Sequence, residues 1–85
     1  MKIYWDGKSK NVIGHNIKKL RKANHLTQKG LAAKLQLEGH DFSDLTILRI
    51  EQGMRFVPDY EVIILADFFD VTTDMLLKGN YMDAE

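Results

Sequence analysis

The chain of 85 residues contains no cysteine and no long apolar run. Without cysteine it can form neither a disulfide framework nor a thiolate metal site, so its core must be held together by packing. No segment approaches the roughly 20 apolar residues that cross a membrane, and residues 1–11 lack the apolar stretch of a secretory signal. A chain of this length forms about one small domain. We therefore expect one soluble, cytoplasmic domain with a single activity and no membrane partner.

Residue sets that carry enzyme or metal chemistry are also missing. The chain has two serines, no glycine-rich phosphate loop, and three histidines that lack the helical spacing of a zinc enzyme. The acids near His40 lack the spacing of a calcium loop, so solvated side chains are the simpler interpretation. The sequence thus predicts no enzyme activity, no metal, no cofactor and no small-molecule effector. The residues considered were His15, His25, His40, Glu38, Asp41 and Asp44.

Charge is balanced over the whole chain but not along it. Residues 1–34 hold nine basic side chains against one acid, a charge of +8, whereas residues 35–85 hold three against eleven, a charge of −8. Such asymmetry favours a polyanionic partner on one side, although two solvated halves that attract one another would show the same pattern.

Helical periodicity organises the first third of the chain. A first amphipathic helix is predicted over about residues 12–23, with lysines and arginine outside its apolar stripe. Thr27 is placed to cap a second helix by accepting backbone N–H groups. Gly30 inside that helix is expected to cost about 1 kcal/mol relative to alanine, with no compensating reason in the sequence. The predicted buried residues are Ile13, Ile17 and Leu20 in the first helix and Leu31, Ala32 and Leu35 in the second.

The remaining helices are marked mainly by their ends. Residues 38–41 form a turn-like cluster, after which Ser43 caps a third helix that stops at Gly53 in the left-handed conformation. Pro58 opens a fourth helix and Thr72 caps a short fifth one. The third helix would bury Ile47 and Ile50, and the fifth would contain Met75, Leu76 and Leu77 before ending at Gly79.

The fourth helix carries two apolar stripes, which a lone helix in water would not have. The first stripe is expected to face the core, whereas the second needs another cover, as do Ile3, Tyr4 and Trp5. The second stripe, or the apolar end from Met75 to Met82, is therefore a candidate contact for a homodimer. The first stripe is Val62, Leu65, Ala66 and Phe69, and the second is Tyr60, Ile64 and Phe68.

Five helices and no sustained strand pattern predict an all-α fold. We divide the chain into an N-terminal extension of residues 1–11, a helical domain of residues 12–78 and a C-terminal tail of residues 79–85.

The order and spacing of five segments resemble the phage-repressor and Cro-like helix-turn-helix family, also called lambda-repressor-like or XRE-type. The sharpest parts are Thr27-Gln28 and the run from Arg49 to Gly53. The resemblance covers about residues 12–78 and implies a five-helix lambda-repressor-like DNA-binding domain acting in transcription regulation, as a repressor in the first instance. The matching segments are IKKLR (17–21), LTQ (26–28), LAAKL (31–35), LRIEQG (48–53) and LA (65–66) through VT (71–72).

The resemblance also implies roles for single residues on double-stranded DNA. Phosphate contacts would position the protein, and the third helix, from Ser43 to Gln52, would read base edges in the major groove, with Arg49 as the main determinant. Arg21 and Glu51 would form a structural ion pair. The predicted phosphate contacts are Thr27, Gln28, Lys29 and Arg55, and the predicted base-reading residues are Ser43, Asp44, Leu45, Thr46 and Arg49.

Two features depart from the family pattern. The turn before Ser43 is about five residues longer than is common, with Phe42 expected to anchor it, and Asp44 puts an acid at the start of the reading helix. Asp44 would repel phosphate unless it accepts a hydrogen bond from cytosine, or it would orient Arg49. These departures and the acidic second half leave an alternative open, a protein-interaction module of antitoxin-like or regulatory type on the same fold. On DNA, a homodimer would place two reading helices about 34 Å apart on a palindromic site.

Overall fold

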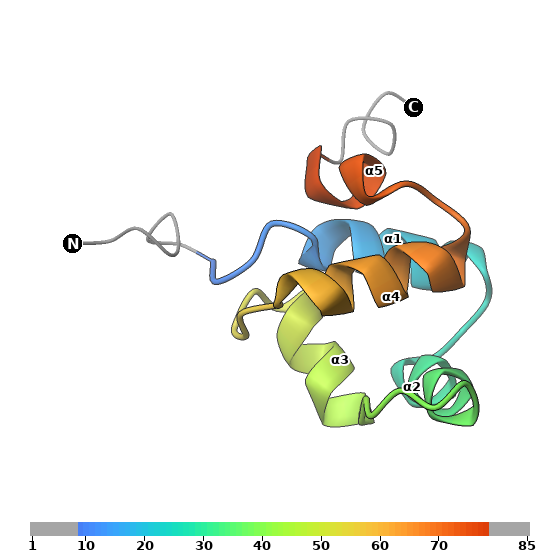
Figure 1. Ribbon diagram of the computed structural model, residues 1–85. Helices are drawn as coiled ribbons and strands as arrows, with labels where there is room; N and C mark the ends of the chain where they lie inside the picture. The colour runs from blue at the N-terminus through green and yellow to red at the C-terminus, as the bar shows by residue number, and fades with distance from the viewer. Residues whose placement is uncertain (1–8, 79–85) are drawn as a thin grey trace.

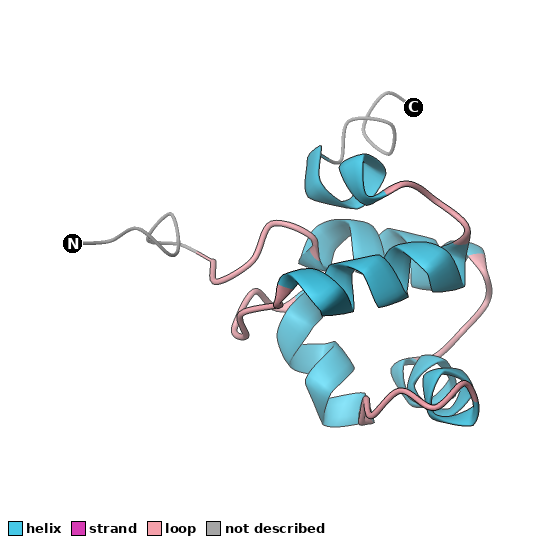
Figure 2. Cartoon of the chain, viewed as in Figure 1, coloured by secondary structure: helices cyan, strands magenta, loops and turns pink. Residues whose placement is uncertain are grey.

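The computed structural model describes residues 9–78, which form five α-helices and no β-strand (Figures 1 and 2). The predicted all-α class with five helices is therefore confirmed. In Figure 1, α2 and α3 lie at the bottom, α1 and α4 cross the middle and α5 lies at the top. The helices are α1 (Gly14–Ala23), α2 (Gln28–Leu37), α3 (Asp44–Glu51), α4 (Asp59–Phe69) and α5 (Thr73–Lys78).

Hydroxyl side chains start three of the helices, as predicted. Thr27 accepts the N–H of Gly30 at 2.9 Å, Ser43 accepts that of Thr46 at 3.1 Å, and Thr72 accepts that of Met75 at 3.1 Å. The structure also shows what surrounds Gly30 inside α2. A Cβ at this position would lie 3.1 Å from the capping hydroxyl of Thr27, which is a close contact.

The start of α1 differs from the prediction by two residues. The helix begins at Gly14 rather than near Val12, and its N-cap Ile13 makes no side-chain capping bond. Asn11 takes over that role, since its Oδ1 accepts the N–H of Gly14 at 2.8 Å. The apolar spacing predicts a start that is too early, because it carries no information about where the first backbone N–H groups of a helix find an acceptor.

Residues with positive φ follow four of the helices, one of them Gly39 in the turn after α2. Gly53 follows α3 with a φ of +73°, which confirms the predicted stop. His25 and Asp70, with φ of 58° and 57°, turn the chain after α1 and α4 in a conformation that most side chains avoid. The Asn24-His25 interruption was visible in the sequence, but nothing there indicated a left-handed Asp70. The predicted stop at Gly79 lies outside the described residues.

Thirteen buried hydrophobic residues from all five helices and the α2–α3 turn form one core. The first stripe of α4 is buried at Val62, Leu65 and Ala66 as predicted, and Phe69 packs at the core's edge. The second stripe does not behave as a unit, because Tyr60 is exposed whereas Ile64 and Phe68 are half-buried. The core residues are Ile13, Ile17, Leu20, Leu31, Ala32, Leu35, Phe42, Ile47, Ile50, Val62, Leu65, Ala66 and Leu76.

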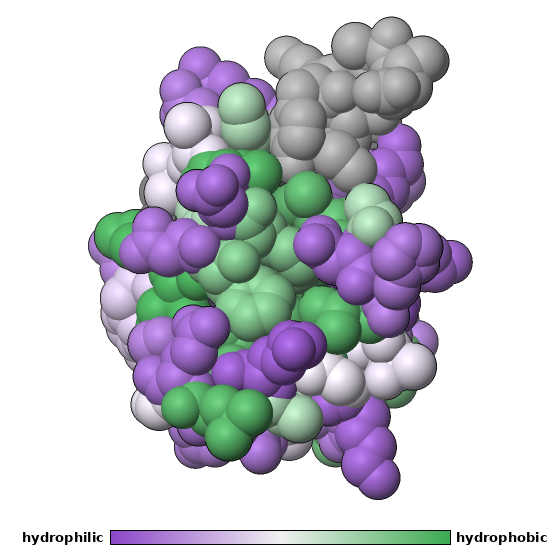
Figure 3. Space-filling model, turned by 90° about the vertical axis from the view of Figure 1, so that its right-hand side faces the viewer, coloured by the Kyte–Doolittle hydropathy of each residue, from purple (hydrophilic) through white to green (hydrophobic). Residues whose placement is uncertain are grey.

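Apolar side chains also reach the surface at one end of the domain. Figure 3 shows this end, at the right in Figure 1, with apolar atoms at the centre and hydrophilic residues around them. The C-terminal end of α4 lies here, where Phe68 and Phe69 pack edge to face with ring centroids 5.0 Å apart. Between residues 9 and 78, no helix has the length and apolar character needed to traverse a bilayer.

Candidate nucleic-acid interface

The two faces of α3 differ sharply. Ile47 and Ile50 are fully buried, whereas Asp44, Leu45 and Arg49 are exposed on the opposite side. The core contacts fix the rotation of the helix about its own axis. They therefore present one acid, one apolar side chain and one cation together to solvent.

Polar groups at the start of α3 are already engaged within the helix. The hydroxyls of Ser43 and Thr46 lie 3.0 Å apart, and Asp44 accepts the N–H of Leu45 at 2.9 Å. Arg49 is different, because its guanidinium forms no hydrogen bond or ion pair with any other described residue. The pairing of Arg49 with Asp44 that the sequence left open is thus absent, and its guanidinium is free to bind an external acceptor.

The back of α3 is tied to α1 through Arg21 and Glu51. Arg21 Nε donates to Glu51 Oε2 at 2.7 Å and Nη2 to Oε1 at 3.0 Å, while Nη1 donates to the carbonyl of Leu26 at 2.8 Å. Both side chains are almost fully buried. The hydrogen bonds to Glu51 raise the pKa of Arg21 although burial opposes this, so the arginine stays charged. The ion pair that the resemblance implied is present and well satisfied.

Gln28, expected to contact phosphate, is hydrogen-bonded to this ion pair. Its Nε2 donates to Glu51 Oε1 at 3.0 Å, so α1, α2 and α3 meet at one carboxylate. The sequence contained no sign of this contact, because Gln28 and Glu51 are 23 positions apart. In the structure, Gln28 positions α2 against α3.

Arg55, also expected to contact phosphate, has a partner of its own. Its Nη1 and Nη2 donate to the two carboxylate oxygens of Glu61 at 2.6 and 3.2 Å, and Nη1 also donates to the carbonyl of Phe56 at 3.1 Å. The hydrogen bonds to Glu61 raise the pKa of Arg55, against the effect of burial. The side chain therefore joins the loop after α3 to the first turn of α4, and a phosphate would have to compete with Glu61.

Lys29 is the predicted phosphate contact whose side chain has no bonding partner among the described residues. It is exposed, and no hydrogen bond or ion pair joins its side chain to the rest of the described chain. Thr27 is exposed too, with its hydroxyl used as the cap of α2. Lys29 lines a hollow of about 200 Å³ between α2 and the start of α3, together with Ser43 and Asp44. The α2 cation and the start of the predicted reading helix therefore border one surface depression.

The long α2–α3 turn is fixed at several points. Gly39 has a φ of +90°, and the N–H of His40 donates to the carbonyl of Leu35 at 2.9 Å. Gln36 Nε2 donates to the carbonyl of Phe42 at 2.7 Å, and the Phe42 side chain is buried in the core as predicted. The added residues thus form an anchored turn that holds the first residue of α3 in place.

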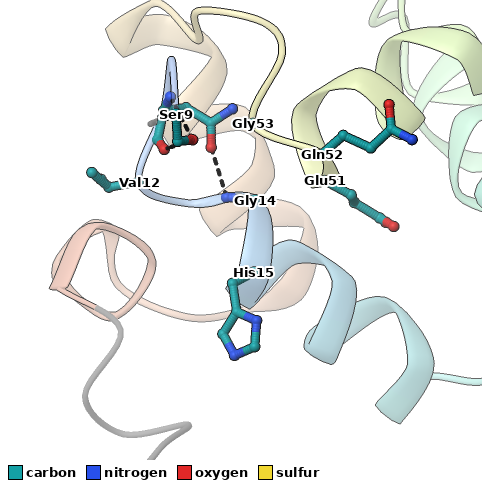
Figure 4. A pocket seen from close by; sticks show the side chains of 8 residues that line it. Ser9, Val12, Gly14, His15, Glu51, Gln52 and Gly53 are labelled. Carbon is teal, nitrogen blue, oxygen red and sulfur yellow. Dashed lines mark hydrogen bonds between the residues drawn. The ribbon is translucent and has the colours of Figure 1, made fainter. Parts of the chain in front are cut away.

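The C-terminal end of α3 is held by the segment before α1. Asn11 Nδ2 donates to the carbonyls of Ile50 at 3.1 Å and Arg55 at 2.9 Å, and the N–H of Lys10 donates to the carbonyl of Gly53 at 2.8 Å. Figure 4 shows this junction as a small hollow in which Gly14 and Gly53 lie near Ser9, with the Glu51 side chain directed away from them. Residues 9–11, assigned to the extension, are therefore part of the domain.

A second asparagine is important for packing and was also missed. Asn16 is buried, and its Nδ2 donates to the carbonyl of Leu76 at 3.1 Å near the end of α5, while its Oδ1 has no hydrogen-bond partner. Asn11 could have been recognised from its place three residues before the first helical glycine. Asn16 gave no such signal, because a polar residue beside an apolar stripe usually faces water.

Among residues 9–78, no group of three histidine or acidic side chains is arranged to hold a metal ion. The site therefore consists of the exposed face of α3 and the adjoining cation of α2, supported from behind by the Arg21–Glu51–Gln28 cluster. Comparisons with family models, with curated proteins and with solved structures find no match to the chain.

Proposed function

We propose that the protein is a sequence-specific regulator of transcription, in the first instance a repressor, that binds double-stranded DNA by inserting α3 into the major groove. The observation that carries this proposal is Arg49, which lies exposed on the outer face of a helix whose rotation is fixed by the core. Its guanidinium has no hydrogen-bond or ion-pair partner in the described part of the chain. A major groove about 12 Å wide admits one α-helix. The proposal places the protein in the cytoplasm with its DNA and in the phage-repressor and Cro-like family.

The exposed face of α3 matches the chemistry of base edges. Arg49 would donate two parallel hydrogen bonds to O6 and N7 of guanine, and Leu45 would contact the methyl group of thymine. Asp44 would accept from the amino group of cytosine. Ser43 and Thr46, whose hydroxyls already bond to each other, contribute less than the sequence suggested. Lys29 at the start of α2 would bind a phosphate and set the register.

We expect Arg49→Ala to weaken binding to the preferred site about 5- to 150-fold and to remove the preference for guanine at one position, because a bidentate arginine–guanine pair is worth about 1–3 kcal/mol. The measurement is selection from randomised duplexes with the full chain, followed by titration of the selected site. The Arg49 side chain forms no hydrogen bond or ion pair within residues 9–78, so the thermal midpoint should not change. A variant that keeps the full sequence preference would refute this role of α3.

We expect Lys29→Ala to weaken binding to all duplexes alike and to lower the slope of log K against log salt by about one, because one phosphate contact is lost. Titrations at several salt concentrations with specific and random duplexes measure both effects. Lys78→Ala is the matched control, since this exposed lysine ends α5 at the opposite end of the domain in Figure 1. Equal salt slopes for the two variants would contradict the phosphate contact.

One observation favours the alternative of a protein-interaction module, namely the apolar surface at the end of α4 in Figure 3. Contiguous apolar patches with a polar rim often mark protein contacts. The same titrations discriminate between the two functions. Affinity for duplex DNA that does not fall with salt, or no binding at low salt, would favour the interaction module.

A further inference from the structure

Asn11 lies where three segments of the chain meet. Its Oδ1 accepts the N–H of Gly14 at the start of α1, and a dashed line at Gly14 marks this bond in Figure 4. Its Nδ2 donates to the carbonyl of Ile50 in the last turn of α3 and to the carbonyl of Arg55 in the loop that follows. A side-chain amide has two N–H donors, and both are used here. One half-buried side chain therefore connects α1, α3 and the loop after α3.

Asn11 is itself held in place by its neighbours. Ser9 Oγ donates to the carbonyl of Asn11 at 2.6 Å, and the N–H of Asn11 donates to Ser9 Oγ at 3.3 Å. The N–H of Lys10 donates to the carbonyl of Gly53 at 2.8 Å. A Cβ on Gly53 would overlap the side chain of Ser9, so these two residues are in direct contact. Residues 9–11, which we call the N-terminal clamp, thus pack across the C-terminal end of α3.

The bonds from Asn11 act on the backbone of α3 itself. The last carbonyls of a helix find no partner within it. The carbonyl of Ile50 accepts the N–H of Gly53 at 3.0 Å, and Asn11 provides its second hydrogen bond. Burial of Ile50 fixes how α3 is rotated, but apolar contacts are non-directional and do not set the position of a helix along its axis. The directional bonds from Asn11 set that position at the last turn of α3.

Arg49 extends from the turn that Asn11 holds. The backbone carbonyl of Arg49 accepts the N–H of Met54 at 2.8 Å, in the loop that is bound by the N-terminal clamp. The Arg21–Glu51 pair also ties α3 to α1, but it reaches α3 through a side chain, whereas Asn11 bonds to the backbone. A bidentate contact with guanine needs the guanidinium to be placed within about 0.5 Å. A small shift of this turn is therefore enough to weaken the contact of Arg49 with a base.

We propose that Asn11 is a positioning residue for DNA recognition, which sets the place of Arg49 against the base edge by holding the last turn of α3 to the start of α1. This inference rests on the proposed DNA binding. It adds that sequence discrimination is controlled by a segment that lies outside α2 and α3. Asn11 then affects the affinity for the preferred site and not the affinity for other duplexes, because the phosphate contact of Lys29 remains.

The variant Asn11→Ser separates this role from the capping of α1. Serine is about as good a helix cap as asparagine, so it can still accept the N–H of Gly14, but its single hydroxyl cannot donate to both carbonyls. We expect the affinity of the full chain for the selected duplex to fall about three- to tenfold, because part of the arginine–guanine contact is lost. The affinity for a random duplex and the salt slope should not change. Titrations of both duplexes at several salt concentrations, well below the thermal midpoint, measure these effects.

Asn16→Ser is the matched control for a loss of stability. The Asn16 amide also donates to the backbone carbonyl of a distant element, but that element is α5, at Leu76. We expect this variant to have a lower thermal midpoint and an unchanged ratio of the two affinities. Asn11→Asp is a second test variant, since a carboxylate keeps the acceptor for Gly14 and cannot donate to the two carbonyls. Circular dichroism checks that each variant is folded.

A double variant tests whether Asn11 acts through Arg49. Asn11→Ser combined with Arg49→Ala should have the same ratio of affinities as Arg49→Ala alone, whereas independent effects would add. A wild-type protein that binds selected and random duplexes equally would overturn the proposed function and this inference with it. A wild-type preference that Asn11→Ser and Asn11→Asp leave intact would overturn the role of Asn11 alone. A loss of preference that Asn16→Ser reproduces, or that adds to the effect of Arg49→Ala, would do the same.

Discussion

Replacing Glu51 with alanine is expected to lower the free energy of unfolding by about 3–5 kcal/mol, a large part of the stability of a domain of this size. The substitution removes the acceptor of two hydrogen bonds from Arg21 and of one from Gln28. Arg21 then keeps a buried charge that retains only the carbonyl of Leu26 as a partner. Uncompensated charge in a low-dielectric site, rather than the lost attraction itself, accounts for most of the cost.

Urea denaturation followed by circular dichroism measures this effect, with Glu61→Ala as the matched control. Glu61 also binds an arginine in two places, but Arg55 is about one-third exposed, so water can solvate it when its partner is removed. We expect the control to cost about 1 kcal/mol. The double variant Arg21→Met with Glu51→Met should recover much of the loss, because no buried charge remains. Equal costs for Glu51→Ala and Glu61→Ala would show that burial of the first pair is not decisive.

The comparison of Glu51→Ala with Arg49→Ala separates support of the site from contact with DNA. The two residues are neighbours in α3, but one side chain is directed inward to α1 and α2 and the other outward to solvent. Glu51→Ala should reduce both stability and DNA binding, whereas Arg49→Ala should reduce binding alone. Loss of binding in a Glu51 variant is therefore no sign of a direct DNA contact.

The elements of the fold that could be predicted from sequence are those fixed by local chemistry. A hydroxyl cap acts over three residues, so Thr27, Ser43 and Thr72 could each be read from the sequence around them. The left-handed Gly53 is equally local. Apolar periodicity likewise identified the buried faces, because it depends only on the helical repeat.

The elements that could not be predicted depend on contacts between distant segments. Gln28 and Arg55 have the side chains of phosphate-binding residues, and their residue types do not reveal that Glu51 and Glu61 lie within reach. Asn11 bonds to a carbonyl 39 positions away, which no local pattern encodes. A phosphate would therefore have to compete with these internal acceptors for both side chains. Packing decides which polar side chains remain for an external partner. Of the predicted DNA-contacting residues with polar side chains, Lys29 and Arg49 are the two whose side chains form no hydrogen bond or ion pair within residues 9–78.

Replacing Gly14 with alanine is expected to destabilise the protein by about 1–3 kcal/mol, although alanine is the better helix former. A Cβ on Gly14 would overlap the backbone carbonyl oxygen of Ile50, at the point where α1 meets the end of α3. A backbone atom cannot rotate away as a side chain can, so the two helices must separate. Thermal and urea denaturation measure the cost.

Gly30→Ala provides the matched control, since this glycine also lies in the first turn of a helix. Its added Cβ would lie 3.1 Å from the hydroxyl of Thr27, a side-chain atom that can shift by a few tenths of an ångström. The gain in helix propensity, at most about 1 kcal/mol, should offset that shift. A rise in stability for Gly14→Ala like that of an ordinary glycine-to-alanine change would refute the close approach. Because Ile50 lies in the same helix as Arg49, any separation at Gly14 must also displace the exposed face of α3. We therefore expect Gly14→Ala to weaken DNA binding even under conditions where the variant remains folded.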